Sequence, residues 1–282
     1  MSTLKFSSSL PLGRKCAYWR FSISHDKRTS MKLVIALCAS TIIAAGCGGG
    51  GDSNNTNSAN NTPAAPAPNA AQGLYSGSDA NNNVVGGVVL DSGAFYFVYA
   101  NTDASALGLV QGTASASHGT FQADNARTFD IVGKAAIDTP VLAGYNERNS
   151  LVGVTYTSAA KQSSIKVNLV YDAAYERPVS LSSVAGSYSG AAGSTKGGEA
   201  TTFTIGQDGS IQGSGVSGCT FSGTTTPHGD KNFLDATVKF GPAPCLYPGM
   251  TLTGVVFFTS NEVLAGLTLP DRSDAFVVAG TK

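Results

Sequence analysis

Apolar and polar residues alternate in short runs from residue 73 to the end of the chain, and this pattern predicts many β-strands. In the clearest run, every second residue is apolar (Ile165, Val167, Leu169 and Tyr171) and the residues between them are mostly polar. A period of two is what a half-buried strand requires. Similar runs lie at 107–111, 128–132, 151–156, 234–240, 250–258, 263–269 and 275–279. No helix of ordinary length is predicted.

Two tight turns join pairs of these runs. Asp91-Ser92-Gly93 separates the apolar runs 84–90 and 94–99, and Gln207-Asp208-Gly209 separates 202–205 from 210–212. Asp and Gly tolerate the backbone conformations that hairpin turns require. The sequence therefore predicts a β-hairpin at each place.

The run 95–99 is strongly aromatic. A strand would place Phe95, Phe97 and Tyr99 on one face and Tyr96 and Val98 on the other. We interpret one face as core packing. The alternative is that one face lines a cavity or a partner surface, since tyrosine combines an apolar ring with a polar hydroxyl.

The chain repeats short segments. Residues 73–77 (GLYSG) return as 186–190 (GSYSG), and 150–154 (SLVGV) are echoed by 251–255 (TLTGV). The two pairs of segments are separated by different numbers of residues, so insertions would have to separate the copies of an internal duplication.

A break in the alternation at 172–184, which contains the Arg177-Pro178 step, divides the strands into two halves. We predict an all-β protein with two small antiparallel β-barrel or sandwich modules, 73–178 and 180–282, because closure or stacking hides strand edges. One continuous barrel is the alternative. A transmembrane barrel is disfavoured, since its strands need about ten residues each.

The segment before the modules has the order of an export signal. In 31–47 (MKLVIALCASTIIAAGC), Lys32 precedes an apolar run, and small residues precede Cys47. This segment resembles the lipobox of bacterial lipoproteins, although Ala44 stands where the family prefers Leu. The resemblance implies a signal region, 1–46, and a lipidated Cys47 that begins the mature protein. The alternative, a transmembrane helix, needs roughly 20 apolar residues.

The residues on either side of this signal differ in character. Residues 1–30 are basic and form either a long n-region or a stretch upstream of the true start codon, which we favour. Residues 47–72 form a lipidated tether rich in Gly, Asn, Ala and Pro, with a flexible span of roughly 25 to 30 Å. In lipoproteins with this signal, Asp after the cysteine resembles an inner-membrane retention mark. Gly48 there favours the outer membrane.

Charge and cysteine content follow from removal of the signal. Residues 47–282 keep 11 Lys or Arg against 17 Asp or Glu, a net charge of about −6, which excludes the basic footprint of nucleic-acid binding.

Cys16 and Cys38 leave with the signal, so Cys219 and Cys245 remain in the modules. We predict a disulfide between them. A metal or catalytic pair is the alternative, but neither cysteine lies in a CxxC motif.

Catalytic and metal-binding patterns are weak. The chain has no G-x-S-x-G elbow, and His118 and His228 each stand before a glycine in an expected loop. Residues 79–83 imitate the start of a calcium loop, but Val84 occupies the glycine position and Leu90 the position of the bidentate Glu. We therefore expect a polar turn there, and we expect no enzyme activity, metal or cofactor.

The Gly-x-Tyr-x-Gly openings, glycine-rich strands and lipid anchor are similar in style to surface lipoproteins of the transferrin-binding protein B and factor H-binding protein type. This resemblance covers 73–282 and implies small eight-stranded barrels and a binding or adhesion module. The partner would be a protein or a small apolar ligand, besides the membrane at Cys47. A structural or assembly component of the envelope and an unrecognised envelope hydrolase are the alternatives.

Overall fold

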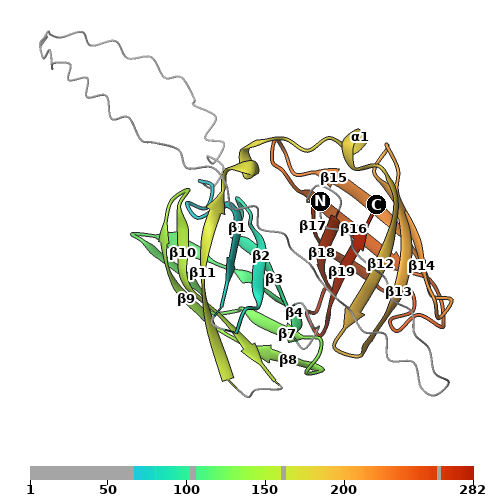
Figure 1. Cartoon of the computed structure of the whole chain (residues 1–282), viewed down its shortest axis with the longest axis horizontal. Helices are drawn as coiled ribbons and strands as arrows, with labels where there is room; N and C mark the ends of the chain where they lie inside the picture. The colour runs from blue at the N-terminus through green and yellow to red at the C-terminus, as the bar shows by residue number, and fades with distance from the viewer. Residues whose placement is uncertain (1–66, 80, 102–105, 160–162, 259–261) are drawn as a thin grey trace, which may run out of the picture. The chain divides into compact units, whose positions relative to one another are not determined.

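The computed structural model describes residues 67–79, 81–101, 106–159, 163–258 and 262–282 (Figure 1). Pro68–Lys282 belong to one compact unit. Most of these residues form β-strands, and the connections include one 3₁₀ turn and one short helix. The predicted all-β class is confirmed. The lipobox segment, Cys47 and the tether up to residue 66 lie outside the described residues. None of the helices that are described has the length and apolar character needed to span a bilayer.

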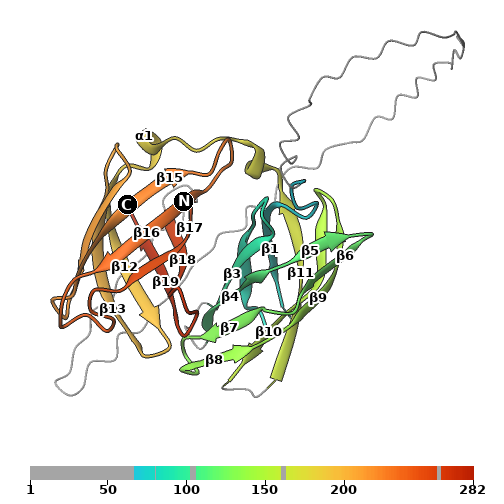
Figure 2. The same cartoon turned by 180° about the vertical axis from the view of Figure 1, so that it is seen from behind.

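The first half forms one curled antiparallel sheet of eleven strands. The strands are β1 (Gly73–Ser78), β2 (Val84–Val89), β3 (Ala94–Ala100), β4 (Leu107–Thr113), β5 (Ser115–Ser117), β6 (Thr120–Ala123), β7 (Arg127–Asp130), β8 (Ala135–Asp138), β9 (Val141–Asn146), β10 (Ser150–Ser158) and β11 (Ser163–Asp172). Their order in the sheet is β5-β6-β9-β10-β11-β1-β2-β3-β4-β7-β8. Figure 2 shows β5 and β6 beside β9.

The chain crosses this sheet only eight times, because three of the crossings, which we call passes, are each broken into two strands. β4 and β5 are one pass broken at Ala114, and β6 continues into β7, as β8 continues into β9. Each broken pass still pairs with the pass that follows it in the chain. In the first of these pairs, β4 pairs with β7 and β5 pairs with β6; in the second, β7 pairs with β8 and β6 pairs with β9. We call the breaks at 114, 124–126 and 139–140 the crease.

Side chains complete the hydrogen bonding at the crease. The Oδ1 atom of Asn125 accepts from the backbone nitrogen of Thr113 at 2.9 Å. Pro140 has no N–H to give to a ladder. The crease therefore interrupts the hydrogen-bond ladders of three neighbouring passes at one level. Some backbone carbonyls at the crease have no partner within the sheet.

The second half forms a closed antiparallel barrel of eight strands. They are β12 (Gly186–Ser194), β13 (Gly197–Ile205), β14 (Ser210–Gly215), β15 (Thr220–Pro227), β16 (Leu234–Phe240), β17 (Thr251–Phe258), β18 (Glu262–Thr268) and β19 (Ala275–Thr281). β12 pairs with β19 and closes the ring. Within the described residues no backbone ladder joins the barrel to the first sheet, so the strands do not form one continuous barrel.

Both predicted hairpins are present. Asp91-Ser92-Gly93 connects β2 and β3, and Gly93 has a φ of 84°. Gly209 has a φ of 81° in the turn between β13 and β14. Glycine reaches this left-handed region at little cost, which explains both turns.

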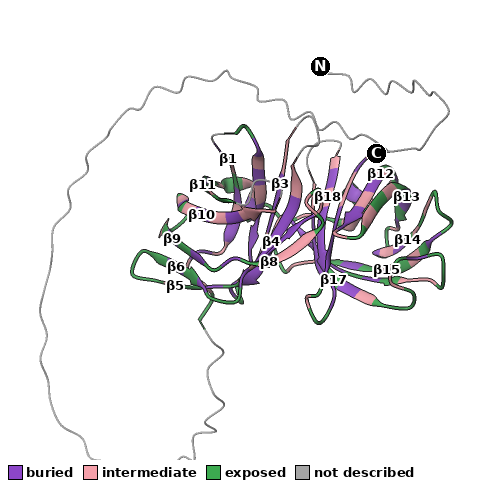
Figure 3. Ribbon diagram, turned by 90° about the horizontal axis from the view of Figure 1, so that it is seen from below, coloured by how far each residue is buried: buried purple, intermediate pink, exposed green. Residues whose placement is uncertain are grey.

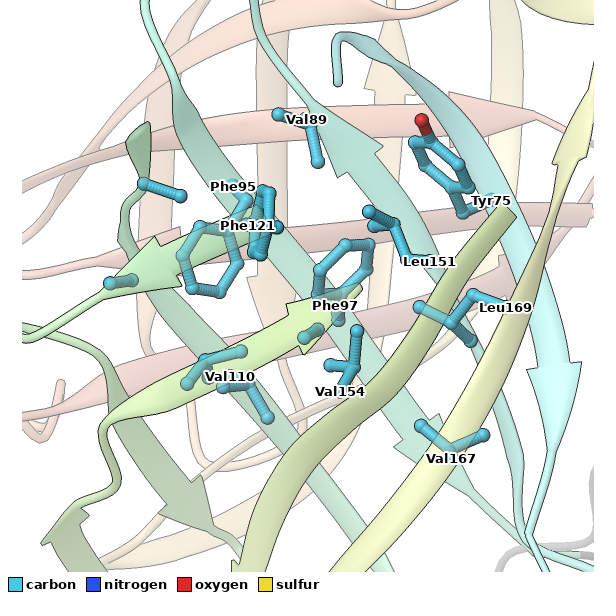
Figure 4. Close-up of a cluster of buried hydrophobic side chains, with 14 of the residues drawn as sticks. Tyr75, Val89, Phe95, Phe97, Val110, Phe121, Leu151, Val154, Val167 and Leu169 are labelled. Atoms are coloured by element: carbon cyan, nitrogen blue, oxygen red, sulfur yellow. The ribbon is translucent and has the colours of Figure 1, made fainter. Parts of the chain in front are cut away.

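Each sheet encloses its own core. In the first, side chains such as Tyr75, Phe97, Leu151 and Leu169 point toward one another between the strands (Figure 4). In the barrel, Tyr188 stacks on Phe203 with ring centroids 5.3 Å apart. The alternation predicted for 165–171 is confirmed, because Val167 and Leu169 are buried in the first core.

The aromatic strand β3 is buried on both faces. Phe95, Phe97 and Tyr99 belong to the first core, as the core interpretation predicted. On the opposite face, Val98 is buried in a second cluster with Ala275 and Val277 of the barrel, and Tyr96 packs against it. Core packing therefore holds for both faces, and the second face packs against the barrel of the same chain.

Two short elements connect the sheets. The 3₁₀ turn η1 (Ala173–Glu176) begins where Asp172 accepts a hydrogen bond from the backbone nitrogen of Ala174 at 2.8 Å. The helix α1 (Leu181–Val184) is capped by Ser180. Another apolar cluster includes Tyr175 of η1 together with Val88, Phe233 and Val255. We call the contacts between the first sheet and the barrel the seam; they include the clusters around Val98 and Phe233.

Candidate functional site: the disulfide-braced end of the barrel

A disulfide joins two turns at one end of the barrel. Cys219 precedes β15 and Cys245 lies in the connection between β16 and β17, with their sulfur atoms 2.06 Å and their Cα atoms 4.5 Å apart. Both cysteines are buried. The predicted disulfide is confirmed.

The connection 241–250 is tied down along its whole length. The backbone nitrogen of Gly241 donates to the carbonyl of Thr220 at 2.7 Å, and that of Gly249 donates to the carbonyl of Gly241 at 3.1 Å. Met250 donates to the carbonyl of Tyr247 at 3.1 Å. Hydrogen bonds and the disulfide thus hold a proline-rich loop in one arrangement.

Tyr247 fixes this loop to the body of the barrel. Its ring packs edge-on against Phe276 at 5.8 Å, and its hydroxyl donates to Asp274 Oδ2 at 2.7 Å. The Lys196 ammonium lies 4.5 Å from the ring centroid. Burial, helped by the hydrogen bond and the charge of Asp274, raises the pKa of the Tyr247 hydroxyl, so the hydroxyl remains a donor at physiological pH.

Three large apolar side chains remain exposed on these braced turns. Val216 is 79% exposed, Leu246 52% and Met250 41%. The two turns touch, since a Cβ atom at Gly218 would lie 3.8 Å from Pro244 Cγ. Neither 215–220 nor 241–250 contains a charged residue. We call Val216, Leu246, Met250 and these two turns the braced tip.

The chain matches no known family model, curated protein or solved structure.

The braced tip has the physical properties of a binding surface. Exposed apolar side chains on a soluble domain mark contact sites more often when they gather than when they are scattered. A loop already fixed by a disulfide and prolines loses little conformational entropy on binding. The tip offers apolar contact and backbone polar groups, and it offers no acid, base or nucleophile within its turns.

A second exposed apolar group lies on the first sheet. Leu142 on β9 is 66% exposed, Val152 on β10 is 52% exposed and Val170 on β11 is 63% exposed. They lie on three neighbouring strands and each follows a buried residue, which places them on the outer face of the sheet. Figure 3 colours the exposed residues of the chain green. No disulfide or proline-rich loop braces these positions, so they serve below as a control surface.

The two histidines considered from the sequence lie apart from the braced tip. His118 is exposed in the turn between β5 and β6. His228 follows β15, with Nδ1 2.8 Å from Asp235 Oδ2 and Nε2 3.5 Å from Asp91 Oδ1. Because both ring nitrogens face carboxylates, the ring is not placed to activate a serine or cysteine.

The calcium-like segment folds as a turn around Asp79. Its Oδ1 atom accepts from the backbone nitrogens of Asn81 and Asn83, and Oδ2 accepts from Asn83 Nδ2 at 2.9 Å and from the Tyr156 hydroxyl at 2.6 Å. Protein donors therefore occupy both carboxylate oxygens. Across the described ranges, no three His, Cys, Asp or Glu residues gather in a way that could hold a metal ion.

Sequence reasoning found the two cysteines but missed the braced tip as a site. The sequence pointed to this site in part, because 241–250 contains three prolines, the apolar residues Leu246 and Met250, and no charged residue. What the sequence did not show is that Tyr247 turns inward while Leu246 and Met250 remain exposed.

Proposed function

We propose that this protein is a non-catalytic, lipid-anchored cell-envelope protein that binds a protein partner through the braced tip. The lipobox resemblance at Cys47 and the polar tether support the anchor and an outer-membrane location. The observation that carries the binding role is the rigid tip, whose two turns contain no charged residue of their own and leave Leu246 and Met250 exposed.

The packing inside the barrel favours a protein over a small apolar ligand. Interior positions hold aromatic side chains in mutual contact, including Tyr188 on Phe203 and Phe240 on Phe276 at 4.9 Å. A small apolar ligand that bound between these rings would have to separate them. A protein partner only has to cover side chains that already face solvent.

The binding role is tested with a tip variant that keeps the fold. The double substitution Leu246→Asp and Met250→Asp places charge on two exposed positions, and Leu142→Asp applies the same change to the control surface of the first sheet. The soluble fragment 68–282 and both variants are first compared by thermal melting, then immobilised and exposed to envelope extract. We expect the captured partner to bind the tip variant at least about tenfold more weakly, since a few anchors dominate an interface.

Equal binding by all three proteins would contradict the role of the braced tip. Loss of binding by the Leu142→Asp variant alone would move the interface to the first sheet.

The anchor is tested separately. Intact-mass analysis of membrane-extracted protein should give a chain that begins at lipidated Cys47, and a Cys47→Ser form should acquire no lipid. Protease added to intact cells then decides the face, because digestion of 68–282 requires surface exposure. A dominant soluble species that retains residues 31–46 would contradict the anchor without affecting the binding test.

A further inference from the structure

Carboxylates from the two sheets face the two ring nitrogens of His228. Asp235, on β16 of the barrel, places Oδ2 2.8 Å from Nδ1. Asp91, in the β2–β3 turn of the first sheet, places Oδ1 3.5 Å from Nε2. The imidazole therefore bridges one carboxylate of the barrel and one of the first sheet.

The ring is held in this position by the seam. His228 stacks on Phe233 with centroids 4.6 Å apart, and Phe233 is fully buried. Phe233 in turn stacks on Tyr175 at 6.2 Å and joins the cluster that contains Val88 and Val255. The His228 side chain is 20% exposed, so solvent screens its contacts only in part.

The other charged groups around the ring already have partners. The Lys231 ammonium lies 2.9 Å from Glu176 Oε2 and 3.2 Å from Asp230 Oδ1. Glu176 also pairs with Arg148 at 3.2 Å. Burial raises the pKa of Tyr175 and of Tyr96, so both phenols near this site stay neutral.

Protonation changes what the ring can do. An imidazolium carries an N–H on each nitrogen and can donate to Asp235 and Asp91 together, whereas neutral imidazole has a single N–H. In the neutral ring, one nitrogen would present a lone pair to a carboxylate. We propose that protonation of His228 closes a clamp between the first sheet and the barrel, which makes the seam sensitive to pH.

The direction of the pH effect follows from the geometry. The hydrogen bond with Asp235 raises the pKa of His228 above 6.5; desolvation opposes this, and the charges of Asp235 and Asp91 add to the increase. A group whose pKa is higher in the folded state stabilises that state below its unfolded pKa. The clamp is therefore fully formed below pH 6.5 and is lost as the pH rises through the higher folded-state value.

The first test is an NMR titration of the His228 ring in fragment 68–282. We expect a pKa above 6.5 that falls toward 6.5 in an Asp91→Asn variant. Asp91 is 58% exposed in its side chain, and asparagine keeps its oxygen acceptor for the Ser92 backbone, so this variant should fold. An unchanged pKa in Asp91→Asn would show that His228 pairs within the barrel alone and would overturn the clamp.

The second test follows stability and seam opening over about pH 5.5 to 8, where imidazole titrates. For wild type, the unfolding equilibrium should shift toward the unfolded state as the pH rises, while His228→Asn should lose this dependence and His118→Asn should keep it. The protection factor of the Asn232 amide, which donates to the Tyr175 carbonyl, should fall as the pH rises in wild type and in His118→Asn, and should not change with pH in His228→Asn. Equal pH profiles for wild type and both the His228→Asn and Asp91→Asn variants would refute the proposal.

Discussion

The hydroxyl of Tyr188 donates a hydrogen bond to the backbone carbonyl of Val184, four residues earlier in the chain. Tyr75 makes the same bond to the carbonyl of Ala71, at 2.9 Å. Each tyrosine lies in the first strand of its sheet and in one copy of the repeated GLYSG and GSYSG segments. The first repeat thus reproduces a specific contact as well as a sequence, which favours an internal duplication.

The second repeat behaves differently. SLVGV lies on β10, which one strand follows in its sheet, whereas TLTGV lies on β17, which two strands follow in the barrel. A register shift next to Gly153 places Leu151 and Val154 in the same core. Leu252 and Val255 instead lie in different clusters. The second resemblance therefore does not mark equivalent positions.

Removing either tyrosine hydroxyl should destabilise its sheet. Tyr75→Phe and Tyr188→Phe each delete a buried hydrogen bond and keep the ring, so we expect each to lower the free energy of unfolding by about 1 kcal/mol. Urea titrations of both single variants and the double variant measure this. Because the two sites lie in separate cores, the losses should add; a loss confined to one variant would argue against equivalent contacts.

Deleting the disulfide should lower stability and loosen the braced tip. Cys219→Ala with Cys245→Ala opens a loop between residues 26 apart, which in the chain-entropy account costs about 3 to 4 kcal/mol. Guanidinium unfolding of wild type, of reduced wild type and of the variant measures the loss. The last two should agree, and a variant as stable as oxidised wild type would refute the expectation.

Arg272 links the barrel to the crease of the first sheet. Its Nη2 atom donates to the carbonyls of Gln111 and Asn125 at 2.8 and 2.7 Å, and Arg127 Nη1 donates back to the Arg272 carbonyl at 3.0 Å. Arg272→Ala should therefore lower the free energy of unfolding by about 1.5 to 3 kcal/mol, as expected for charged donors. Chemical denaturation of 68–282 measures this.

Arg272→Gly separates the side-chain contacts from the backbone strain at this position. Arg272 has a φ of 54°, which glycine adopts more readily than alanine. The glycine variant should therefore lose the same contacts but remain more stable than the alanine variant by about 0.5 to 1 kcal/mol. The reverse order would show that the conformation of this turn is not strained.

The ionised carboxylate of Asp79 should stabilise the first sheet at neutral pH and lose this effect in acid. Burial by itself raises the pKa of its carboxyl, but the hydrogen bonds from Tyr156, Asn83 and Asn81 outweigh burial and hold the pKa below 3.8. Its contribution to stability is thus present above pH 3.8 and is lost as the pH falls through the lower folded-state value. Asp79→Asn should be less stable than wild type at neutral pH, and the two stabilities should converge in acid. Parallel curves from neutral to acid pH would contradict this role.

Local patterns determined the strands and their turns. The alternation at 165–171 gave the buried face of β11, Asp91-Ser92-Gly93 gave the β2–β3 turn, and Cys219 and Cys245 are the two cysteines in residues 73–282 and so form a pair. Each of these depends on residues close in sequence, or on a count, so no knowledge of the fold is needed. The short strands β5, β6, β8 and β9 were missed because Asn125 and Pro140 break long passes at the crease.

Tertiary structure decided what covers each surface. A period of two shows that a strand has two faces, but it cannot show that Val98 is buried by Val277 from the far end of the chain. For the same reason, the sequence shows His228 as a loop residue beside a glycine, and only the seam brings Asp91 to its second nitrogen. The exposure of Leu246 and Met250 likewise depends on Tyr247 turning inward to Phe276, because burial is set by neighbours in space rather than in sequence.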